Sequence, residues 1–517
     1  MSNPIKPETD SHPAKDELAH FVAEIEDAIS REDWAFAATL IEENTAAAWF
    51  GMQPPRTMEI VSLLASKIPS HGSLLHAGYR LLTAASAGQF DVHEYLSTVD
   101  TNNAEEMFLL SMLRMSDFRV HGRTIEALEQ GETANDYHGK MHPTVDANDG
   151  WALQTSVQIG ISAMLAGDFT RALSALTQAQ MHAAVPKYAF LTRDALVKSA
   201  LLHACFGNAA TARSFLDRAT RIPRTSSWAE AHIDTHRDFA EILTSIDDYD
   251  EAIERLDTIS LHDIGEMWPF YIVAVQRVLV SAGYLDELDH RLEVFDSMPL
   301  PRVDGNGFAG SVIPVKRAML AMEAGRGADA QELLVRADHN LPYTQIIEAA
   351  GHLYAGRTQQ AIQLATQLRS QTRGFRVLDL RRKSVLAAAQ NQAGETSQCV
   401  ETLERVADIP RGLGDEEIRL FSPETRELAA KHVPSWPKDP GGASTFLTGL
   451  PKPGRGLTER EVELMAEVAK GHTRAEIAER LFVSLNTVKT QLKSAYRKLE
   501  VSSADDAVLA AQRRGLI

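Results

Sequence analysis

The amino-acid sequence predicts an all-α protein, in which a long array of irregular helix hairpins is followed by a compact domain of four short helices. From about residue 17 to 430, apolar residues recur at helical spacing, and the alternating apolar and polar runs typical of strands are few. A short phrase occurs seven times within this stretch, six times with a glycine. After residue 456 the signals change to closely spaced helix caps. Together these observations predict two structurally distinct regions.

The composition limits the classes of protein that the chain can represent. Its 517 residues exceed what one hydrophobic core usually organises. The 52 basic and 70 acidic residues give a net charge of -18, which argues against nucleic-acid binding unless cations gather at one place. Cys205 and Cys399 are too few for a disulfide framework or a four-ligand zinc site. Without a signal peptide or a membrane-length apolar stretch, we expect a cytoplasmic protein that enters no membrane, with a disordered tail at residues 1–16.

The repeated phrase predicts the turns between paired helices. Its copies are AGDFTRAL at 166, FGNAATAR at 206, IDDYDEAI at 246, AGYLDELD at 282, AGRGADAQ at 324, AGRTQQAI at 355 and AGETSQCV at 393. Six copies carry a glycine that is expected to end a helix with a positive φ, namely Gly167, Gly207, Gly283, Gly325, Gly356 and Gly394. Five residues later most copies carry a small side chain where two helices would approach closely, namely Ala172, Ala212, Ala252, Ala330, Ala361 and Cys399. Asp247 replaces the glycine once and Leu288 the small residue once, and weaker copies occur at 31–38 and 87–94.

The architecture of residues 17–430 resembles a degenerate tetratricopeptide-like solenoid, because the copies are spaced by 31 to 42 residues. Solenoids present long concave surfaces. We therefore expect this region to sense an unidentified effector or to bind a partner protein rather than to catalyse a reaction. A generic α-helical domain remains the alternative, since the period is imperfect.

Residues 431–456 predict a linker between the two regions. The segments HVPSWPKDPGGAST and LPKPGRG carry several prolines and glycines. These residues disfavour helix and leave a chain extended or mobile.

Residues 457–517 contain the most specific pattern in the chain. Capping residues indicate four helix starts, namely the reciprocal boxes Thr458-x-x-Glu461 and Thr473-x-x-Glu476 and the single caps Ser484 and Ser503. Gly471 and the short segment 482–484 leave room only for tight turns between the first three helices.

The third of these helices is predicted to have one apolar and one cationic face. The apolar stripe consists of Leu485, Val488, Leu492, Ala495 or Tyr496, and Leu499. The opposite face carries Asn486, Lys489, Thr490, Lys493 and Arg497, with Lys498 nearby. Residues 457–517 hold ten basic and nine acidic residues, a net charge of +1, so the rest of the chain carries -19. Such a helix face can read base edges while neighbouring cations and amides hold phosphate.

Residues 457–517 resemble the LuxR-type (GerE) DNA-binding domain through LTERE, GHTRAEIAERL, VSLNTVKTQLKSAYRKL and the terminal GLI. The resemblance implies a four-helix fold, dimerisation through the last helix, and binding to two-fold-related half-sites of double-stranded DNA. It also implies a set of base-edge positions and a set of positions near phosphate. These are Lys489, Thr490 and Lys493 for the bases, and Thr473, Arg474, Ser484 and Thr487 for phosphate. Asn486 and Arg497 complete the predicted DNA face.

Two positions depart from the family pattern. Gln491 stands where many members have His, and Ala504 stands where many have Arg before the last helix. The first departure affects packing or a backbone contact. The second removes an ion pair and leaves the strength of dimerisation open.

The overall expectation is a regulator of transcription that has no enzymatic activity, cofactor or metal. The chain lacks a G-x-x-x-x-G-K-[ST] loop, so the ATPase module of the large LuxR-type regulators is absent, and no hydrolytic motif is present. We expect a homodimer on promoter DNA and a contact with RNA polymerase, and the resemblance favours activation over repression. The alternative is a protein-interaction scaffold whose helix-turn-helix serves mainly self-association, a view that the acidic array favours.

Overall fold

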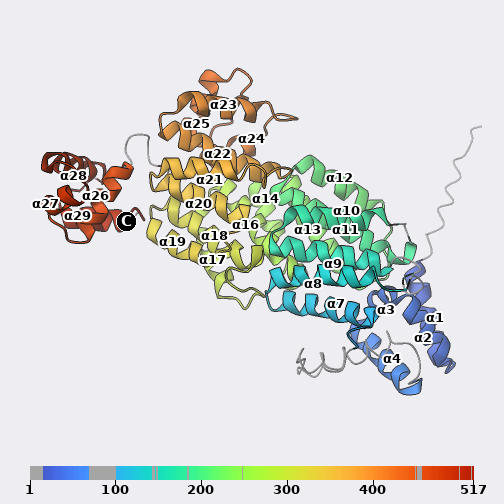
Figure 1. The fold of residues 1–517 in the computed structure, drawn as a ribbon. Coiled ribbons are helices and arrows are strands. Elements are labelled where there is room, and N and C mark those ends of the chain that lie inside the picture. The colour runs from blue at the N-terminus through green and yellow to red at the C-terminus, as the bar shows by residue number, and fades with distance from the viewer. Residues whose placement is uncertain are drawn as a thin grey trace, which may run out of the picture.

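The computed structural model describes residues 16–68, 100–142, 146, 150–182, 185–246, 248–448, 450, 457–499, 501–513 and 515–517. Within these ranges the regular structure is helical and includes no strand, as the sequence predicts. The helices stack from the blue N-terminal end to the orange end of the array, and the red C-terminal helices form a separate group at one flank (Figure 1). No helix in these ranges combines the length and the apolar character that a membrane crossing requires.

Four helices open the chain, namely α1 (Glu17–Ser30), α2 (Trp34–Glu43), α3 (Thr45–Gly51) and α4 (Pro54–Lys67). Asp16 caps α1, because its carboxylate accepts hydrogen bonds from the amides of Leu18 and Ala19 at 3.1 Å. The rest of the predicted tail, residues 1–15, lies outside the described residues. The weak repeat at 31–38 falls on the turn between α1 and α2, whereas the one at 87–94 also lies outside the described residues.

All seven copies of the repeated phrase fall at the turn of a helix hairpin. The hairpins are α9 (Gly150–Ala166) with α10 (Phe169–Met181), α11 (Ala189–Phe206) with α12 (Ala209–Thr220), α13 (Glu230–Thr244) with α14 (Tyr249–Asp257), α16 (Trp268–Ala282) with α17 (Leu285–Ser297), α18 (Gly307–Glu323) with α19 (Gly327–Val335), α20 (Pro342–Tyr354) with α21 (Thr358–Gln367), and α22 (Arg376–Gln392) with α23 (Thr396–Ala407). Shorter elements connect or follow them, namely η2 (Pro186–Tyr188), α15 (Leu261–Ile264), η3 (Gly265–Met267), α24 (Asp415–Ile418) and α25 (Pro423–His432).

The predicted hinge glycines have positive φ with one exception. Gly207 has φ -104° and ψ -126°. A Cβ there would lie 2.3 Å from Nδ1 of His203, so any other residue would force the His203 side chain to move. The prediction for the small residues is confirmed, since all six are buried, as is Leu288. The hinges therefore place small side chains where the paired helices meet. Asp247 lies outside the described residues.

One hairpin was missed in the sequence. It consists of α7 (Ala104–Val120) and α8 (Thr124–His138). Gly122 between them has φ +73°, and Ala127, five residues later, is fully buried. The phrase HGRTIEAL thus carries the same glycine and small residue at the same offset as the other copies.

An aromatic cluster lies in the core of the array, for which the sequence predicts a long concave surface. Its members are buried and come from successive hairpins, namely Phe169, Phe206, Phe270, Phe308, Tyr343 and Phe375. The rings of Phe169 and Phe206 stack at 4.7 Å, and the ring of Phe308 lies 5.2 Å from that of Tyr343. These aromatic side chains thus bring α10, α11, α18 and α20 onto one core.

The first part of the predicted linker is packed rather than mobile. Its large apolar side chains are buried against the array, namely Val433, Trp436, Phe446 and Leu447. Arg426 of α25 fixes the segment by donating to the carboxylate of Asp439 at 2.6 Å and to the carbonyl of Gly442 at 2.7 Å. The prolines and glycines do keep the segment out of helix, but its apolar residues hold it in place. Residues 451–456 lie outside the described residues.

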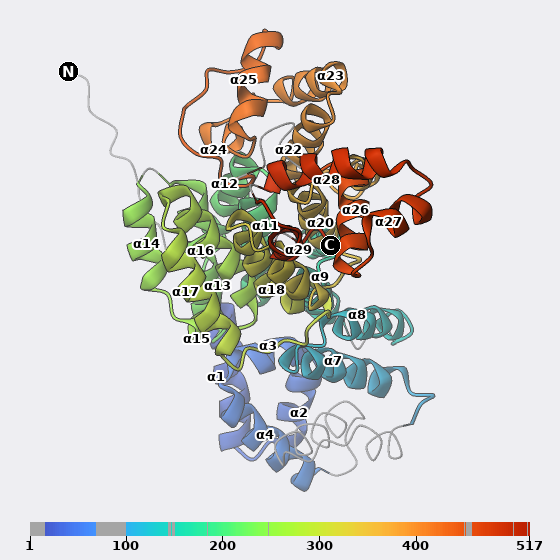
Figure 2. The same ribbon diagram turned by 90° about the vertical axis from the view of Figure 1, so that its left-hand side faces the viewer.

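The C-terminal helices are α26 (Glu459–Ala469), α27 (Arg474–Arg480), α28 (Leu485–Leu499) and α29 (Ala504–Arg513). They surround a core of their own. In both views the C-terminus lies beside the array (Figures 1 and 2), where Gln331 of α19 donates to the carbonyl of Gly515 at 3.0 Å. Ala355 of the array also packs in the same apolar cluster as Leu457.

Candidate nucleic-acid interface

Both predicted capping boxes are present in the C-terminal domain. At the start of α26, the amide of Glu461 donates to Oγ1 of Thr458 at 3.3 Å, and the amide of Thr458 donates to the carboxylate of Glu461 at 2.7 Å. At the start of α27, Thr473 and Glu476 form the same pair of bonds at 3.4 and 2.7 Å. Each box satisfies two amides that a helix N-terminus leaves free and so fixes where the helix begins.

The turn between α27 and α28 is tight, as the sequence predicts. Phe482 has φ +54°, and the amide of Thr487 donates to Oγ of Ser484 at 3.0 Å, which caps α28. The Phe482 side chain is 95 % exposed. This aromatic surface beside the N-terminus of α28 was missed, because in the sequence the residue marks only a connection.

The apolar stripe of α28 packs on α26 and α29. Val488, Leu492, Ala495 and Leu499 are buried, in agreement with the predicted spacing. Leu485 differs, since it is 43 % exposed at the first turn of the helix. The stripe holds the opposite face of α28 toward solvent.

The predicted DNA face is exposed along the outer side of α28. Asn486, Lys489, Thr490, Lys493 and Arg497 are all exposed there. Within the described ranges, none of the three cations among them has an ion pair with an acidic group. The hydroxyl of Thr490 donates to the carbonyl of Asn486 at 2.9 Å. The structure therefore brings these five side chains onto one surface with available positive charge.

The positions predicted to lie near phosphate border this face at helix N-termini. Thr473 and Arg474 are exposed at the start of α27, and Ser484 is exposed at the start of α28. Thr487 is half-buried, and its hydroxyl forms a hydrogen bond with that of Ser484 at 2.7 Å. Helix N-termini carry free amides and a positive dipole end, both suited to an anion.

Lys498 does not belong to the exposed cations. Its Nζ lies 2.7 Å from the Glu461 carboxylate, and both side chains are largely buried. Burial alone would raise the pKa of Glu461, but its hydrogen bonds with Lys498 and the Thr458 amide lower that pKa below its usual value. This pair joins α28 to the start of α26. A cation with an acidic partner of this kind has a structural role.

Arg480 and Lys470 are also held by an acid. The carboxylate of Glu467 lies 2.8 Å from Arg480 and 2.6 Å from Lys470. Hydrogen bonds from Lys470 and Arg480 lower the pKa of Glu467 below its usual value. In the described part of this domain, Lys489, Lys493 and Arg497 on the outer face of α28 have no such acidic partner, and neither do Arg474 and Arg513.

Known proteins match this domain in sequence. Residues 455–511 match the family model of bacterial regulatory proteins of the luxR family. The transcriptional regulatory protein LiaR of Bacillus subtilis is 40 % identical over 65 residues, which cover 13 % of this chain and 31 % of LiaR. The response regulator protein VraR of Staphylococcus aureus is 41 % identical over 61 residues, which cover 12 % of this chain and 29 % of VraR. The chain therefore spans about a third of the length of these curated relatives.

Proposed function

Because residues 455–511 form a luxR-family helix-turn-helix domain, we propose that the chain is a sequence-specific regulator of transcription that binds double-stranded promoter DNA. The observation that carries this proposal is the outer face of α28, where Lys489, Lys493 and Arg497 are exposed without acidic partners among the described residues. The sequence similarity of this domain to the regulators LiaR and VraR supports the proposal.

In this proposal α28 lies in the major groove. Lys489 and Lys493 donate to acceptor atoms on base edges, and Thr490 offers a hydroxyl and a methyl group at the same depth. Asn486 is the first exposed polar group on this face, one turn before Thr490. Arg497, in the last turn, reaches the phosphate of one strand.

The N-termini of α27 and α28 hold the backbone of the DNA. Thr473 and Ser484 cap these helices, so the remaining free amides point along the helix axes toward an anion. Arg474 adds a positive charge beside the first of them, and Thr487 orients the Ser484 hydroxyl. These contacts set the register of α28 without reading sequence.

The finer parts of the proposal concern assembly and output. Leu509 of α29 is 47 % exposed, which suits a small apolar contact between two copies on half-sites related by two-fold symmetry. The array senses an effector or a partner protein, and the bound dimer activates transcription through a contact with RNA polymerase.

The test is genome-wide occupancy of the tagged full-length chain beside a variant that carries Lys489→Ala and Lys493→Ala. We expect discrete promoter sites with paired half-sites for the parent chain, and loss of these sites in the variant. The matched control carries Arg31→Ala and Arg405→Ala, which remove two exposed array cations that pair with acids one turn away.

Retention of sites in the Lys489 and Lys493 variant would contradict the assigned face. Absence of discrete sites in the parent chain, together with recovery of stable protein partners by residues 1–456, would replace the proposal with the scaffold function.

A further inference from the structure

One arginine of the array is buried without a counter-charge. Arg381 of α22 is only 7 % exposed, and its Nε has no hydrogen-bond partner. Among the described residues its guanidinium forms no ion pair. Its side chain lies over the ring of Phe446, 5.4 Å from the ring centre. Burying a charged group without a partner is costly, which makes this position exceptional in the array.

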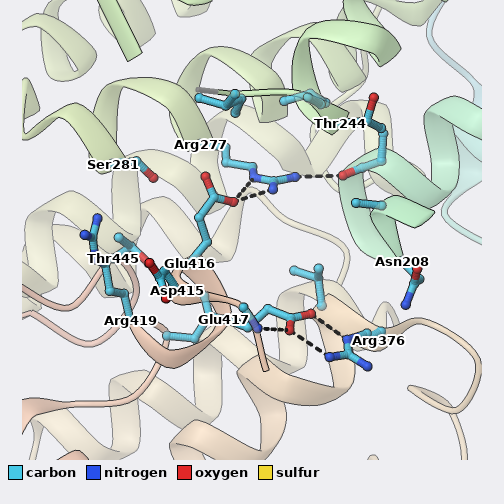
Figure 3. Close-up of a pocket in the computed structure, with 18 of the residues that line it drawn as sticks. Asn208, Thr244, Arg277, Ser281, Arg376, Asp415, Glu416, Glu417, Arg419 and Thr445 are labelled. Carbon is cyan, nitrogen blue, oxygen red and sulfur yellow. Dashed lines mark hydrogen bonds and ion pairs between the residues drawn. The ribbon is translucent and has the colours of Figure 1, made fainter. Parts of the chain in front are cut away.

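Arg381 lines a cleft of about 670 Å³ between the middle of the array and the segment around α24. The cleft walls come from α11, α12, α13, α14, α16, α22 and α24. Figure 3 shows the green helices of the middle of the array facing the orange α22–α24 segment across it. The volume exceeds that of an inorganic ion and lies in the range of small-metabolite sites.

The cleft is positively charged, although the whole chain carries -18. Its basic residues are Arg213, Arg277, Arg376, Arg381, Arg411 and Arg419, and its acidic residues are Asp415, Glu416 and Glu417. This set has a net charge of +3, six minus three. Such a local excess on an acidic protein draws anions to the cleft.

Two of these arginines are neutralised by the acids of α24. Arg277 pairs with Glu416 and Arg376 with Glu417, each at 2.5 Å (Figure 3). The first pair joins α16 to α24 across the cleft, whereas the second joins α22 to α24 within one wall. They also use two of the three acids of the cleft.

The other arginines donate to neutral groups or have no partner. Arg213 donates to the carbonyl of Thr244 at 2.6 Å, and Arg411 donates to the Asn208 side chain at 3.4 Å. Nε of Arg419 is buried and unpartnered, like that of Arg381. Donors of this kind are available to a ligand.

A second buried cation lies behind the wall. Nζ of Lys316 donates to Oε1 of Gln276, a residue of the cleft, at 2.5 Å. Burial and the charge of Arg381 lower the pKa of Lys316 well below its usual value. Burial also lowers the pKa of Arg381. Both shifts mean that positive charge is disfavoured in this part of the array, because the described residues supply no anion to stabilise it.

We propose that the cleft binds a small oxyanion-bearing metabolite, a phosphate ester or a polycarboxylate, whose anionic group pairs with Arg381. Arg419 and Arg213 contribute further donors, and the apolar wall residues contact the rest of the molecule. If the chain regulates transcription as proposed, this metabolite is the effector that the array senses. That role rests on the proposed function, whereas the binding itself does not. Because the ligand contacts α22, α12 and the end of α24 together, its binding stabilises the folded state of this part of the array.

The experiment measures binding by calorimetry with the full-length chain and without DNA, using inorganic phosphate, pyrophosphate and citrate, with chloride as the ionic-strength control. We expect saturable one-to-one binding of pyrophosphate or citrate and a higher unfolding temperature in its presence. Preference for pyrophosphate assigns a phosphorylated ligand, and preference for citrate assigns a polycarboxylate.

The key variant is Arg381→Met, which keeps an unbranched apolar side chain and removes the guanidinium. We expect the affinity for the preferred probe to fall roughly 10- to 100-fold, since a charge-assisted hydrogen bond is lost. The unliganded variant should be at least as stable as the parent chain, because an unpaired buried charge is removed. A purely structural role for Arg381 would instead lower stability and leave affinity unchanged.

Arg213→Gln, at the exposed rim, is the second variant if Arg381→Met does not fold, and Arg31→Gln is the control outside the cleft. Arg213→Gln should weaken binding several-fold, and Arg31→Gln should not. No binding of any probe, or equal binding by all variants, would overturn the proposal. Because no DNA is present, these outcomes are independent of promoter binding.

Discussion

In the array, Arg193 is buried between the carboxylates of Glu230 and Asp234, whereas on α28 Lys489 and Lys493 are exposed and have no acidic partner among the described residues. The same contrast holds inside the C-terminal domain, where Lys498 is paired and buried. The net charge follows it, with +1 for residues 457–517 and -19 for the remainder.

The contrast teaches how to separate structural from functional cations. A buried cation with an acid on each side stabilises the fold, and removing one partner leaves the other charged and unpaired. An exposed cation without a partner adds little to the fold and is free to replace counterions on phosphate. The presence of an acidic partner therefore distinguishes structural from DNA-binding cations, whereas a count of lysines and arginines does not.

The largest expected effect concerns a paired cation of the array. Arg193→Ala leaves buried Glu230 with only Arg224, at 4.0 Å, as an ion-pair partner, and we expect the free energy of unfolding to fall by about 3 to 5 kcal/mol. Urea unfolding of the full-length chain measures it. Arg31→Ala, which breaks an exposed pair with Asp27, is the control and should change stability by less than about 0.5 kcal/mol. A loss below about 1 kcal/mol for Arg193→Ala would show that burial and pairing do not make a cation structural.

The second prediction concerns an unpaired acid of the array. Burial raises the pKa of Glu323, in the last turn of α18, to about 7. Because its folded pKa lies above the unfolded value of 4.5, the folded state binds the proton more tightly, and stability falls as pH rises from about 4.5 through 7. The full penalty, reached above pH 7, is up to about 3 kcal/mol.

Glu323→Gln removes this titrating group. We expect the variant to gain stability over the parent chain at pH 8 and to match it near pH 4.5, as measured by urea unfolding across this range. A constant difference in stability between the two proteins at every pH would show that the pKa of Glu323 is the same in the folded and unfolded states.

The third prediction concerns the exposed cations of α28. In the Lys489→Ala, Lys493→Ala variant we expect DNA affinity to fall about 100-fold, because each lysine contributes roughly 1 to 3 kcal/mol at a base edge. The free energy of unfolding should change by less than about 0.5 kcal/mol. Fluorescence titration on an occupied promoter site over a series of salt concentrations measures the affinity. A large loss of stability with unchanged DNA affinity would show that Lys489 and Lys493 are structural cations and do not bind DNA.

Much of the fold could be predicted because it depends on local chemistry. The hinge at Gly167, the capping box at Thr458 and the stripe through Val488 need only spacing and residue type, and the structure confirms them. The same local signals were present at Gly122, where the hairpin was missed.

The rest depends on contacts between distant segments. Trp436 lies in a segment whose prolines and glycines indicate a linker, yet it is buried against the array. Lys498 belongs by spacing to the cationic stretch of α28, but it pairs with Glu461, thirty-seven residues earlier. The sequence also does not show that Arg381 lacks an acidic partner. The folded structure shows it, because two acids of α24 pair with Arg277 and Arg376 instead.

The smallest expected effect compares the two capping boxes, which are equivalent in sequence but differ in position. Thr458→Ala and Thr473→Ala each remove one cap, so each should lower the stability of the C-terminal domain by about 1 kcal/mol. Thr473 borders the proposed DNA face at the start of α27, whereas Thr458 starts α26, beside the buried pair of Glu461 and Lys498. We therefore expect Thr473→Ala alone to weaken DNA binding a further few-fold, at a temperature where both variants are fully folded. Equal DNA affinities in the two variants would show that the cap at Thr473 contributes no more to DNA binding than the cap at Thr458. The DNA face would then be restricted to α28.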